Sequence, residues 1–411
     1  MYPEINSERL WQRHVEMAKI GATKGGGVHR LALTSEDIAA HRLLADWAEA
    51  RGFAIALDDI GNMFVRREGA DSSLPPVASG SHIDTQPFGG RFDGITGVLV
   101  AFEALEALED AGIESRAPLE TIAWNNEEGS RFIPACMGSA VYAGNEPLDD
   151  MRAATDANGE TMGSCVDRLK AALPGATHRE LGAPMTAFLE AHIEQGPELE
   201  ANENIIGIVT GMQGYRRFTV EVTGEDAHSG TTPRARRKDA FMAANDMVQA
   251  LRAELEDEAD TVRFTIGRFS VEPGGISVVP GRIAFTIDLR NPVPETLEKL
   301  GNRIPEICRE NAGPCTVVTD EFIKQPPLEF PAEIRERFTA AAERRGYPHQ
   351  AIYSGAGHDA RHALKLCPAG MIFIPCWKGI SHNEAERAEP EHIAAASQII
   401  ADLLVDIANE T

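Results

Sequence analysis

The sequence predicts an α/β protein with a mostly parallel sheet, interrupted by a smaller α+β domain. Short apolar segments alternate with amphipathic helical segments in residues 1–211 and again in residues 326–411, and this alternation is typical of βαβ units. Residues 212–325 instead show the order strand, helix, strand, strand, helix, strand, which is the ferredoxin-like split βαββαβ unit. A chain of 411 residues has room for two or three domains of about 150 residues each.

In the larger domain, hydrophobic periodicity and turn residues indicate each element in turn. The N-terminus reads as an amphipathic helix with Leu10, Trp11, Val15 and Ala18 on or near one face. Residues 53–66 alternate around Asp-Asp and Gly-Asn pairs, which is a hairpin signal. The expected strands are 77–81, 119–124, 188–193 and 370–374, and the expected helices are 36–51, 95–109, 332–346 and 391–408, with short surface helices in 150–185.

The inserted domain shows strand alternation and two long amphipathic helices. Its first strand, RFTVEV at 217–222, alternates polar and apolar residues. Gln325-Pro326-Pro327 marks its exit, because proline interrupts a strand. The expected strands are 217–222, 262–271, 282–289 and 316–322, and the expected helices are 239–255 and 296–311.

Composition and charge exclude several classes of protein. Lys and Arg number 39 against 63 Asp and Glu, so the net charge is −24, and such a field repels phosphate backbones and anionic lipid surfaces. We therefore expect no nucleic-acid or membrane partner. The sequence has no apolar run of about 18 residues that would span a membrane, and its N-terminus lacks the apolar core of a signal peptide. Six cysteines lie scattered without a CxxC pair, so we expect reduced thiols in a cytoplasmic protein.

Polar clusters follow apolar strands at four points, and strand ends are where α/β folds place their sites. In GSHIDTQPFGGRFDG, residues 80–94, His82 and Asp84 share one face of a strand, so Asp84 could hold the imidazole from behind. Asp93, further along the same loop, could reach the same cation. A surface loop with ordinary turn residues is the alternative.

The other three clusters are WNNEEGSRF, HIEQGPELE and GISHNEAE. Successive side chains of an extended segment point in opposite directions, so Glu127 and Glu128 would serve different tasks. One could ligate a metal and the other could handle the proton of a water molecule. His192 and His382 each follow an apolar strand. Taken singly, these clusters are at least as well explained by a solvated loop or a structural histidine.

Taken together, the clusters predict a metal centre. The candidate ligands, all nitrogen or oxygen donors, are His82, Asp93, Glu128, His192 and His382. Such donors suit Zn²⁺, Mn²⁺, Co²⁺ or Ni²⁺. Five ligands exceed the need of one tetrahedral site, whereas a shared Asp with two further ligands on each side would hold two ions about 3.5–4 Å apart.

Seven motifs, in order along nearly the whole chain, carry a family resemblance. They are GSHIDTQPFGGRFDG, NNEEGSRF, HIEQGPELE, AHSGTTP, SVVPG with FTIDLR, GAGHDA and IFIPCWKGISHNEAE. On these motifs the sequence resembles the M20 metallopeptidase clan, and more closely the hydantoinase/carbamoylase family of amidases. The resemblance implies a mixed-sheet, zinc-exopeptidase-like catalytic domain formed by 1–211 and 326–411, with an inserted ferredoxin-like lid or dimerisation domain at 212–325.

Position by position, the resemblance implies a role for each candidate ligand. Asp93 would bridge two divalent ions. His82 and His192 would complete one site, and Glu128 and His382 would complete the other. The cofactors expected are therefore two divalent ions per subunit, of Zn, Mn, Co or Ni.

The resemblance also implies catalytic and substrate-binding residues. Glu127 would be the general base for the water between the metals, and Asp84 would orient the first histidine. His228 would stabilise the oxyanion, reaching into the partner subunit's site of a homodimer formed through the inserted domain. Gln195 would contact the substrate, and Arg290 would pair with its carboxylate in a bidentate fork.

Further substrate contacts are expected from GAGHDA, where Gly357, His358 and Asp359 would line the pocket. Some positions depart from the family pattern. Ser277, which the resemblance implies is a substrate-binding position, stands where the family usually has an Asn that contacts the substrate carboxylate. HSGTTPR replaces HAGTTPM, so Arg234 replaces an apolar residue. In the last motif, SHNEAE stands where small residues and Pro usually follow the His. These departures suggest a substrate with an additional anionic group.

The activity implied is hydrolysis of a linear amide or ureido C–N bond in a small substrate that carries a carboxylate, as in N-carbamoyl-L-amino-acid hydrolases. Allantoate amidohydrolase and β-ureidopropionase activities are the alternatives within the family. A dipeptidase or aminoacylase of the wider M20 clan is a more distant alternative, as is a binding protein that has lost catalysis.

Overall fold

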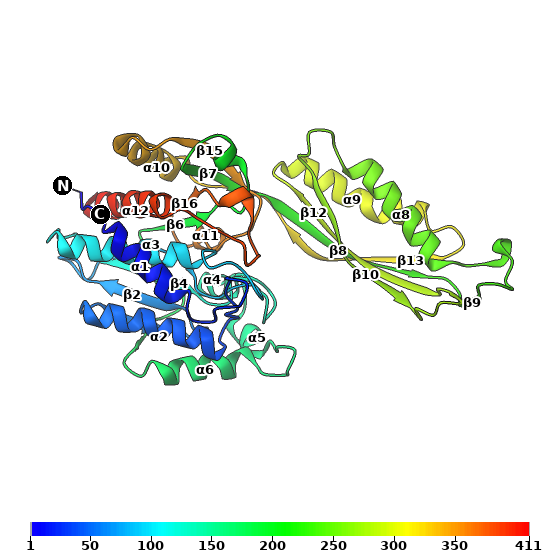
Figure 1. Ribbon diagram of the computed structural model, residues 1–411, viewed down its shortest axis with the longest axis horizontal. Coiled ribbons are helices and arrows are strands. Elements are labelled where there is room, and N and C mark those ends of the chain that lie inside the picture. Colours follow the sequence, from blue (N-terminus) through cyan, green and yellow to red (C-terminus); the bar gives the residue numbers. More distant parts are fainter. Residues whose placement is uncertain (1, 411) are drawn as a thin grey trace. The chain divides into compact units, whose positions relative to one another are not determined.

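The computed structural model describes residues 2–410. The chain divides into two compact units: unit 1 comprises the residues up to Thr210 and those from Phe330 onward, and unit 2 is Gly211–Glu329 (Figure 1). These bounds lie close to the 212–325 expected for the inserted domain.

All six cysteines are buried and free. No helix within residues 2–410 combines the length and the apolar character that crossing a bilayer requires.

Unit 1 is built on a large mixed sheet. Its strands, in spatial order, are β7 (Ile206–Met212), β16 (Ala369–Ile374), β6 (Ala187–Ile193), β3 (Val77–His82), β4 (Leu119–Trp124), β2 (Met63–Arg67), β1 (Ala54–Leu57) and β5 (Thr177–His178), and β15 (His349–Ser354) pairs with β7. The four central strands β16, β6, β3 and β4 run parallel and are buried along their whole length, which is why they read as apolar runs.

The flanks of this sheet correct one expectation. Strand β2 is antiparallel to β4, and β7 is antiparallel to β16. The prediction of a mostly parallel sheet therefore holds for the four central strands and for the outer β1–β5 pair. The flanking antiparallel pairs join strands that are distant in the sequence, so no local hairpin signal indicates them. The mixed sheet implied by the family resemblance is confirmed.

Helices cover the sheet of unit 1. They are α1 (Ser7–Met17), α2 (Ser35–Ala50), α3 (Ile95–Asp110), α4 (Met137–Tyr142), α5 (Leu148–Ala153), α6 (Met162–Ala172), α7 (Glu198–Ala201), α10 (Ala332–Arg345), α11 (Ala360–Ala363), the 3₁₀ turn η2 (Trp377–Gly379) and α12 (Pro390–Glu410). Helices α3 and α12 pack on each other and on β3, and nearly every residue of α3 is buried. The α3 carboxylates Glu103 and Glu106 are buried too, and arginines neutralise them.

The N-terminal helix buries a different face from the one expected. Its buried residues are Leu10, His14 and Met17, whereas Val15 is exposed. Leu10, His14 and Met17 recur at spacings of four and three residues and so form one helical face, which includes a histidine that hydrophobic periodicity does not mark as a core residue. His14 nevertheless lies in the core beside the rings of Trp11 and Phe92, at centroid distances of 6.4 and 5.8 Å.

Unit 2 is a four-stranded antiparallel sheet with two helices. Its elements in chain order are β8 (Gly214–Thr223), β9 (Ala227–His228), the 3₁₀ turn η1 (Arg234–Arg236), α8 (Ala240–Leu255), β10 (Arg263–Glu272), β11 (Val278–Val279), β12 (Arg282–Asn291), α9 (Pro294–Glu310), β13 (Thr316–Gln325) and β14 (Leu328–Glu329). The sheet order is β10-β12-β8-β13. Alternate residues of β8 and β12 are buried, and they form a core with one face of α8 and α9, as the βαββαβ pattern predicts.

Candidate metal centre

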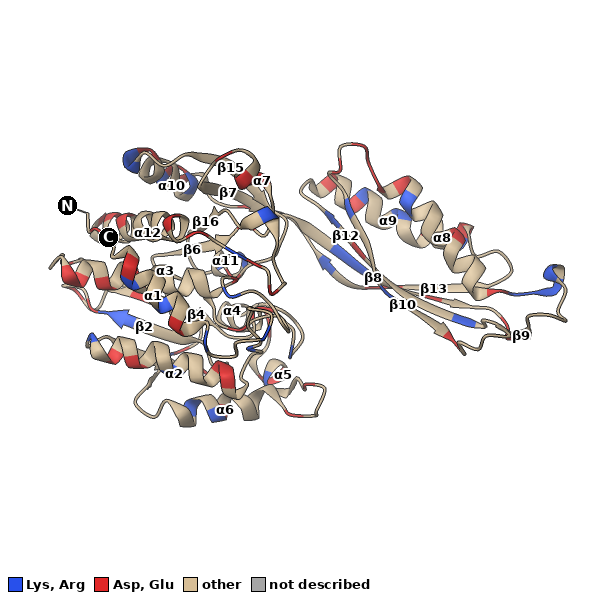
Figure 2. Ribbon diagram, in the orientation of Figure 1, with Lys and Arg blue, Asp and Glu red and all other residues tan. Residues whose placement is uncertain are grey.

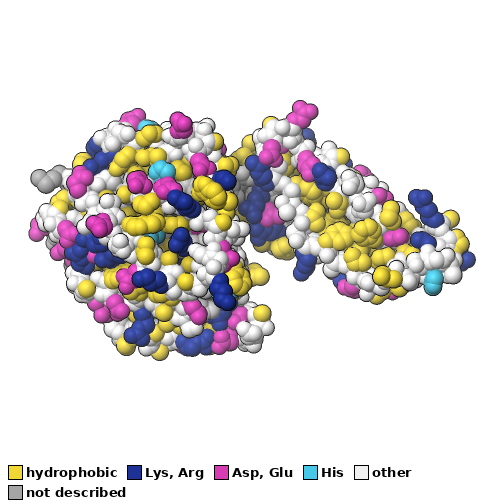
Figure 3. All heavy atoms as spheres, viewed as in Figure 1, with side chains coloured by type: hydrophobic (Ala, Val, Ile, Leu, Met, Phe, Trp, Pro, Cys, Tyr) yellow, Lys and Arg dark blue, Asp and Glu magenta, His cyan; other side chains and the backbone are white. Residues whose placement is uncertain are grey.

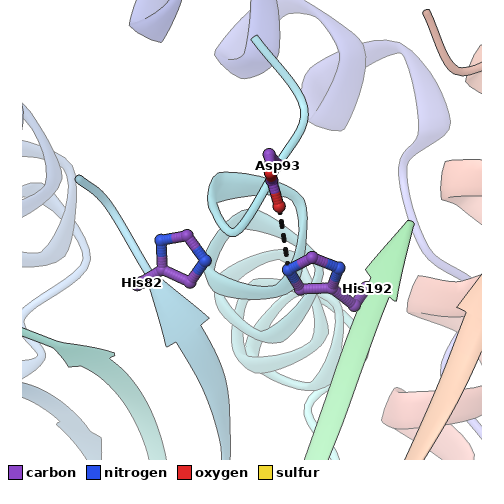
Figure 4. Close-up of side chains that lie close together, drawn as sticks. All are labelled: His82, Asp93 and His192. Carbon is purple, nitrogen blue, oxygen red and sulfur yellow. Dashed lines mark ion pairs between the residues drawn. The ribbon is translucent and has the colours of Figure 1, made fainter. Parts of the chain in front are cut away.

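Three of the predicted ligands meet at the carboxyl ends of the central strands. His82 is the last residue of β3, His192 lies near the end of the parallel strand β6, and Asp93 comes from the loop that leads into α3 (Figure 4). One ligand atom from each of the three lies within 4.8 Å of the others. Asp93 Oδ1 is 3.1 Å from His192 Nε2, and all three side chains are buried.

The other predicted ligands form a second group on the opposite oxygen of Asp93. Asp93 Oδ2 is 3.3 Å from His382 Nε2, and that nitrogen is 3.7 Å from Glu128 Oε2. One ligand atom from each of these residues again lies within 4.8 Å of the others. The two groups share Asp93, so they form the arrangement in which one carboxylate can serve two cations.

Main-chain carbonyl groups hold the buried imidazoles in the orientation that ligation requires. His82 Nδ1 is 2.9 Å from the carbonyl oxygen of Asp84, and His192 Nδ1 is 2.9 Å from that of Ile193. An N–H at Nδ1 donated to these carbonyls leaves the lone pair on Nε2, the nitrogen that can ligate. In His192 this nitrogen lies 3.2 Å from the backbone nitrogen of Gly94. The Asp84 carboxylate accepts hydrogen bonds from the backbone N–H groups of Glu127 and Glu128, at 3.1 and 3.2 Å. Asp84 thus touches His82 mainly through its main chain, and its side chain holds the two glutamates.

The charges of these groups favour a cation. Burial, followed by repulsion from Asp359, raises the pKa of Glu127 well above its usual value, and burial together with Asp93 does the same for Glu128. Burial also opposes ionisation of Asp93, but its contacts with His192 and His382 outweigh that effect and hold its pKa well below the usual range. Several carboxylates therefore crowd one buried region beside the imidazoles of the two groups, and this set of oxygen and nitrogen donors suits divalent ions.

Glu127 lies beside the first group of ligands. Its Oε2 is 3.4 Å from His82 Nε2, and its Oε1 accepts a hydrogen bond from the thiol of Cys136 at 3.1 Å. Glu127 is buried, but 8% of its surface remains accessible to solvent. A carboxylate in this position can exchange a proton with a water molecule held by the ligands.

Comparisons with known proteins show the family to which the chain belongs. A family model described as Peptidase family M20/M25/M40 matches residues 78–406. The chain belongs to this family. It is 38% identical to an N-carbamoyl-L-amino-acid amidohydrolase of Rhizobium meliloti, over 98% of this chain and 97% of that protein. It is 34% identical to an allantoate amidohydrolase of Escherichia coli (strain K12), over 95% and 96% respectively.

A solved structure gives the same result. The crystal structure of an amidase of the hydantoinase/carbamoylase family from Burkholderia multivorans matches with a TM-score of 0.89 and 41% identity, over 98% of each chain. The resemblance inferred from the seven motifs is therefore confirmed, and so is the mixed α/β fold.

The structure of this M20 protein also places the expected substrate contacts of unit 1. Gln195 Nε2 donates a hydrogen bond to Asp93 Oδ2 at 2.9 Å. The His358 ring is 4.5 Å from the His192 ring, and Asp359 accepts a hydrogen bond from the Ser139 hydroxyl. The second carboxylate oxygen of Asp359 is buried and has no hydrogen-bond partner. A β-carbon added at Gly357 would meet open space.

The remaining expected residues belong to unit 2. His228 Nδ1 accepts hydrogen bonds from the backbone N–H groups of Gly230 and Thr231, at 3.0 and 3.2 Å, which places the imidazole proton on Nε2. Ser277 lies beside it, because its carbonyl oxygen accepts a hydrogen bond from the N–H of Ser229.

Arg290, also in unit 2, forms a two-pronged ion pair with Asp288, at 2.9 and 3.0 Å. The guanidinium fork is therefore engaged with a carboxylate of its own strand β12. Lys and Arg residues gather near β9, in the loop that leads to α8 (Figure 2).

Sequence reasoning did not single out four residues that contact the ligands or the expected base. Gln86 donates to both carboxylate oxygens of Glu128, through its backbone N–H and its side-chain amide, at 3.0 and 2.7 Å. Cys136 has no motif around it, and only the fold brings its thiol to Glu127. Ser381 and Glu386 stand on either side of His382 in GISHNEAE. A fully buried carboxylate four residues after a ligand could have been suspected from that motif, but its contacts depend on a loop almost 300 residues earlier in the chain.

Proposed function

We propose that this protein hydrolyses a linear ureido or amide C–N bond in small substrates that carry a carboxylate, with N-carbamoyl-L-amino acids as the first choice. The observation that carries the proposal is one buried carboxylate, Asp93, shared by two groups of ligands, with Glu127 beside them. The names of the relatives from Rhizobium meliloti and Burkholderia multivorans support the same reaction class.

The metal ligands proposed are those of the two groups. Asp93 is the shared ligand, His82 and His192 hold one divalent ion, and Glu128 and His382 hold the other. Bound at these positions, two such ions would polarise the scissile carbonyl group and lower the pKa of a water molecule. The donor set accepts Zn²⁺, Mn²⁺, Co²⁺ or Ni²⁺.

The protein's own groups carry the protons. Glu127 accepts a proton from the attacking water and delivers it to the leaving nitrogen. Asp84 fixes the main chain of Glu127 through its carboxylate. If the scissile group is a carbamoyl group, the products are an amine, CO₂ and ammonia. His228 offers an N–H at Nε2, the kind of donor that a developing oxyanion needs, and its role, like that of Arg290, stays a prediction.

A metal-reconstituted substrate panel tests the proposal. It contains N-carbamoyl-L-amino acids, allantoate, β-ureidopropionate, N-acyl amino acids and dipeptides, read by ammonia release and by appearance of the amine. We expect ammonia release from a ureido substrate. Turnover of dipeptides alone would instead establish the peptidase alternative. Allantoate is the second candidate, because the Escherichia coli relative is an allantoate amidohydrolase.

The basic loop between β9 and α8 in unit 2, which contains Arg234, Arg236 and Arg237, predicts which substrates of the panel should be preferred. Arg234 and Arg236 are exposed, whereas Arg237 donates to the carbonyl oxygens of Ser229 and Thr232. We infer that the exposed arginines favour a substrate with an additional anionic group. Plain N-carbamoyl amino acids turned over equally well by the parent and by Arg234→Ala would contradict this inference.

A homodimer through unit 2 is also proposed. Strand β10 is an edge of the four-stranded sheet, and hydrophobic side chains gather on the visible surface of this unit (Figure 3). Its exposed large hydrophobic residues are Phe241, Met242, Phe269, Val271, Ile276, Val293, Val318 and Phe322. An open edge with apolar side chains is suited to pairing with a second copy.

We also propose a cytoplasmic location, because all six cysteines are buried and free and reduced thiols are typical of that compartment.

A further inference from the structure

A buried carboxylate outside the predicted ligand set lies against the main chain of the shared ligand. Glu386 is only 2% exposed, and it follows His382 in the loop between β16 and α12. Its Oε1 accepts hydrogen bonds from the backbone N–H groups of Phe92 and Asp93, at 2.9 and 3.0 Å. Two main-chain donors on one oxygen fix the backbone of Asp93 in place.

The other oxygen of Glu386 is linked to the side chain of the same ligand through the hydroxyl of Ser381. Ser381 donates to Glu386 Oε2 at 3.0 Å, and the Ser381 hydroxyl is also 3.2 Å from Asp93 Oδ2. Ser381 directly precedes His382 in the chain. Glu386 therefore connects the loop that carries Asp93 with the loop that carries His382.

Glycine at position 90 makes room for this carboxylate. A β-carbon built at Gly90 would overlap the carboxyl group of Glu386. The φ angle of Gly90 does not lie in the left-handed region, so its backbone conformation would accept an alanine. A steric clash with the carboxylate of Glu386 is what excludes alanine at this position. The loop 86–94 is thus shaped around Glu386.

We propose that Glu386 is a positioning residue for the dinuclear centre. It acts through Asp93: by fixing the backbone N–H groups of residues 92 and 93 and the Ser381 hydroxyl, it aims the two oxygens of Asp93 at the two groups of ligands. This inference rests on the proposed function, because it requires that cations bind there. Groups that orient metal ligands usually change metal affinity about 10- to 100-fold when they are removed.

The test measures binding of Zn²⁺ or Mn²⁺ alone, without substrate, by chelator competition and by metal analysis after gel filtration. We expect the parent protein to hold two ions. Glu386→Ala should weaken binding of at least one ion by about 10- to 100-fold. Glu386→Gln should restore most of the affinity, because its amide oxygen can still accept from the two N–H groups.

Gly90→Ala tests the same contact from the other side, and it remains informative where Glu386→Ala does not fold. It should weaken metal binding as Glu386→Ala does, because the added methyl group displaces the carboxylate. Glu103→Ala and Gly175→Ala are matched controls. Glu103 is another fully buried carboxylate that accepts a backbone N–H, that of Asn6, and a β-carbon at Gly175 meets only an ordinary contact. Both controls should keep the metal affinity of the parent.

The outcomes separate the two claims. A parent protein that binds no pair of ions refutes the proposed function itself. A parent that binds two ions, together with Glu386→Ala or Gly90→Ala variants of unchanged affinity, overturns only the role of Glu386. Equal weakening by Glu386→Ala and Glu103→Ala would also overturn it, because a general loss of stability would then explain the effect.

Discussion

Replacing His14 by leucine should remove a source of acid sensitivity from the fold. His14 is 3% exposed, and both of its ring nitrogens are buried without a hydrogen-bond partner. Burial lowers the pKa of His14 to about 3. The folded protein therefore keeps this ring neutral at pH values where the unfolded chain protonates it.

The magnitude follows from proton linkage. An unfolded histidine titrates near about pH 6.5, and below that pH the unfolded state binds a proton that the folded state refuses. Stability then falls by about 1.36 kcal/mol for each pH unit below this value, down to the folded pKa of about 3. Between about pH 7 and about pH 5 the loss from His14 is about 2 kcal/mol. Because both conditions lie above the folded pKa, the figure depends little on that value.

The assay is urea unfolding of the metal-free protein at the two pH values, for the parent, His14→Leu and an exposed-histidine control, His178→Gln. The free energy of unfolding of His14→Leu, relative to the parent, should rise by about 2 kcal/mol on going to the lower pH. The control replaces a half-exposed histidine, so it separates the effect of burial at position 14 from the effect of losing a histidine elsewhere. An identical difference between His14→Leu and the parent at both pH values would refute the reasoning.

Three further outcomes are expected. Glu127→Gln should keep two bound ions and lose about two to four decades of kcat, whereas Glu128→Gln should lose one ion in metal analysis; equal metal loss in both would reverse their assigned roles. Cys136→Ala should lower kcat about two- to tenfold at unchanged KM, the effect of one hydrogen bond to the base, and Cys136→Ser should recover most of it; a change in KM alone would contradict this. Phe269→Lys, which places a charge on edge strand β10, should shift a dimer toward monomer in light scattering after gel filtration, and an unchanged mass would remove β10 from the interface.

The parts of the fold that depend on local pattern were predictable. The four central strands and helices α2 and α3 lie within a few residues of their expected positions, because continuous apolar runs and amphipathic periodicity are properties of the segments themselves. Strand β7 was missed, since its IGIVTGM sequence contains two glycines, which weaken strand signals. Strand β7 pairs antiparallel with β16, a segment about 160 residues away. The sequence of β7 itself therefore does not indicate this pairing.

The candidate site divides in the same way. The rule that α/β proteins place their sites at strand ends was enough to select the clusters that hold the five candidate ligands, but it left open which of Glu127 and Glu128 would bind a metal. Which atom orients which ligand was not predictable, because it depends on distances between loops. His82 is held by the carbonyl oxygen of Asp84 and not chiefly by its carboxylate. The alternation along one strand correctly placed the two residues side by side but does not distinguish a main-chain oxygen from a side-chain oxygen.

Two carboxylates of this centre serve the same structural purpose on different loops. Asp84 accepts the backbone N–H groups of Glu127 and Glu128, and Glu386 accepts those of Phe92 and Asp93. Each thus holds two adjacent residues, one of them a proposed metal ligand. Glu127 instead receives a thiol, a much weaker donor, so its carboxylate is left with greater capacity to accept a proton. Substitution of the holding carboxylates should therefore change metal affinity first, and substitution of Glu127 should change the rate first.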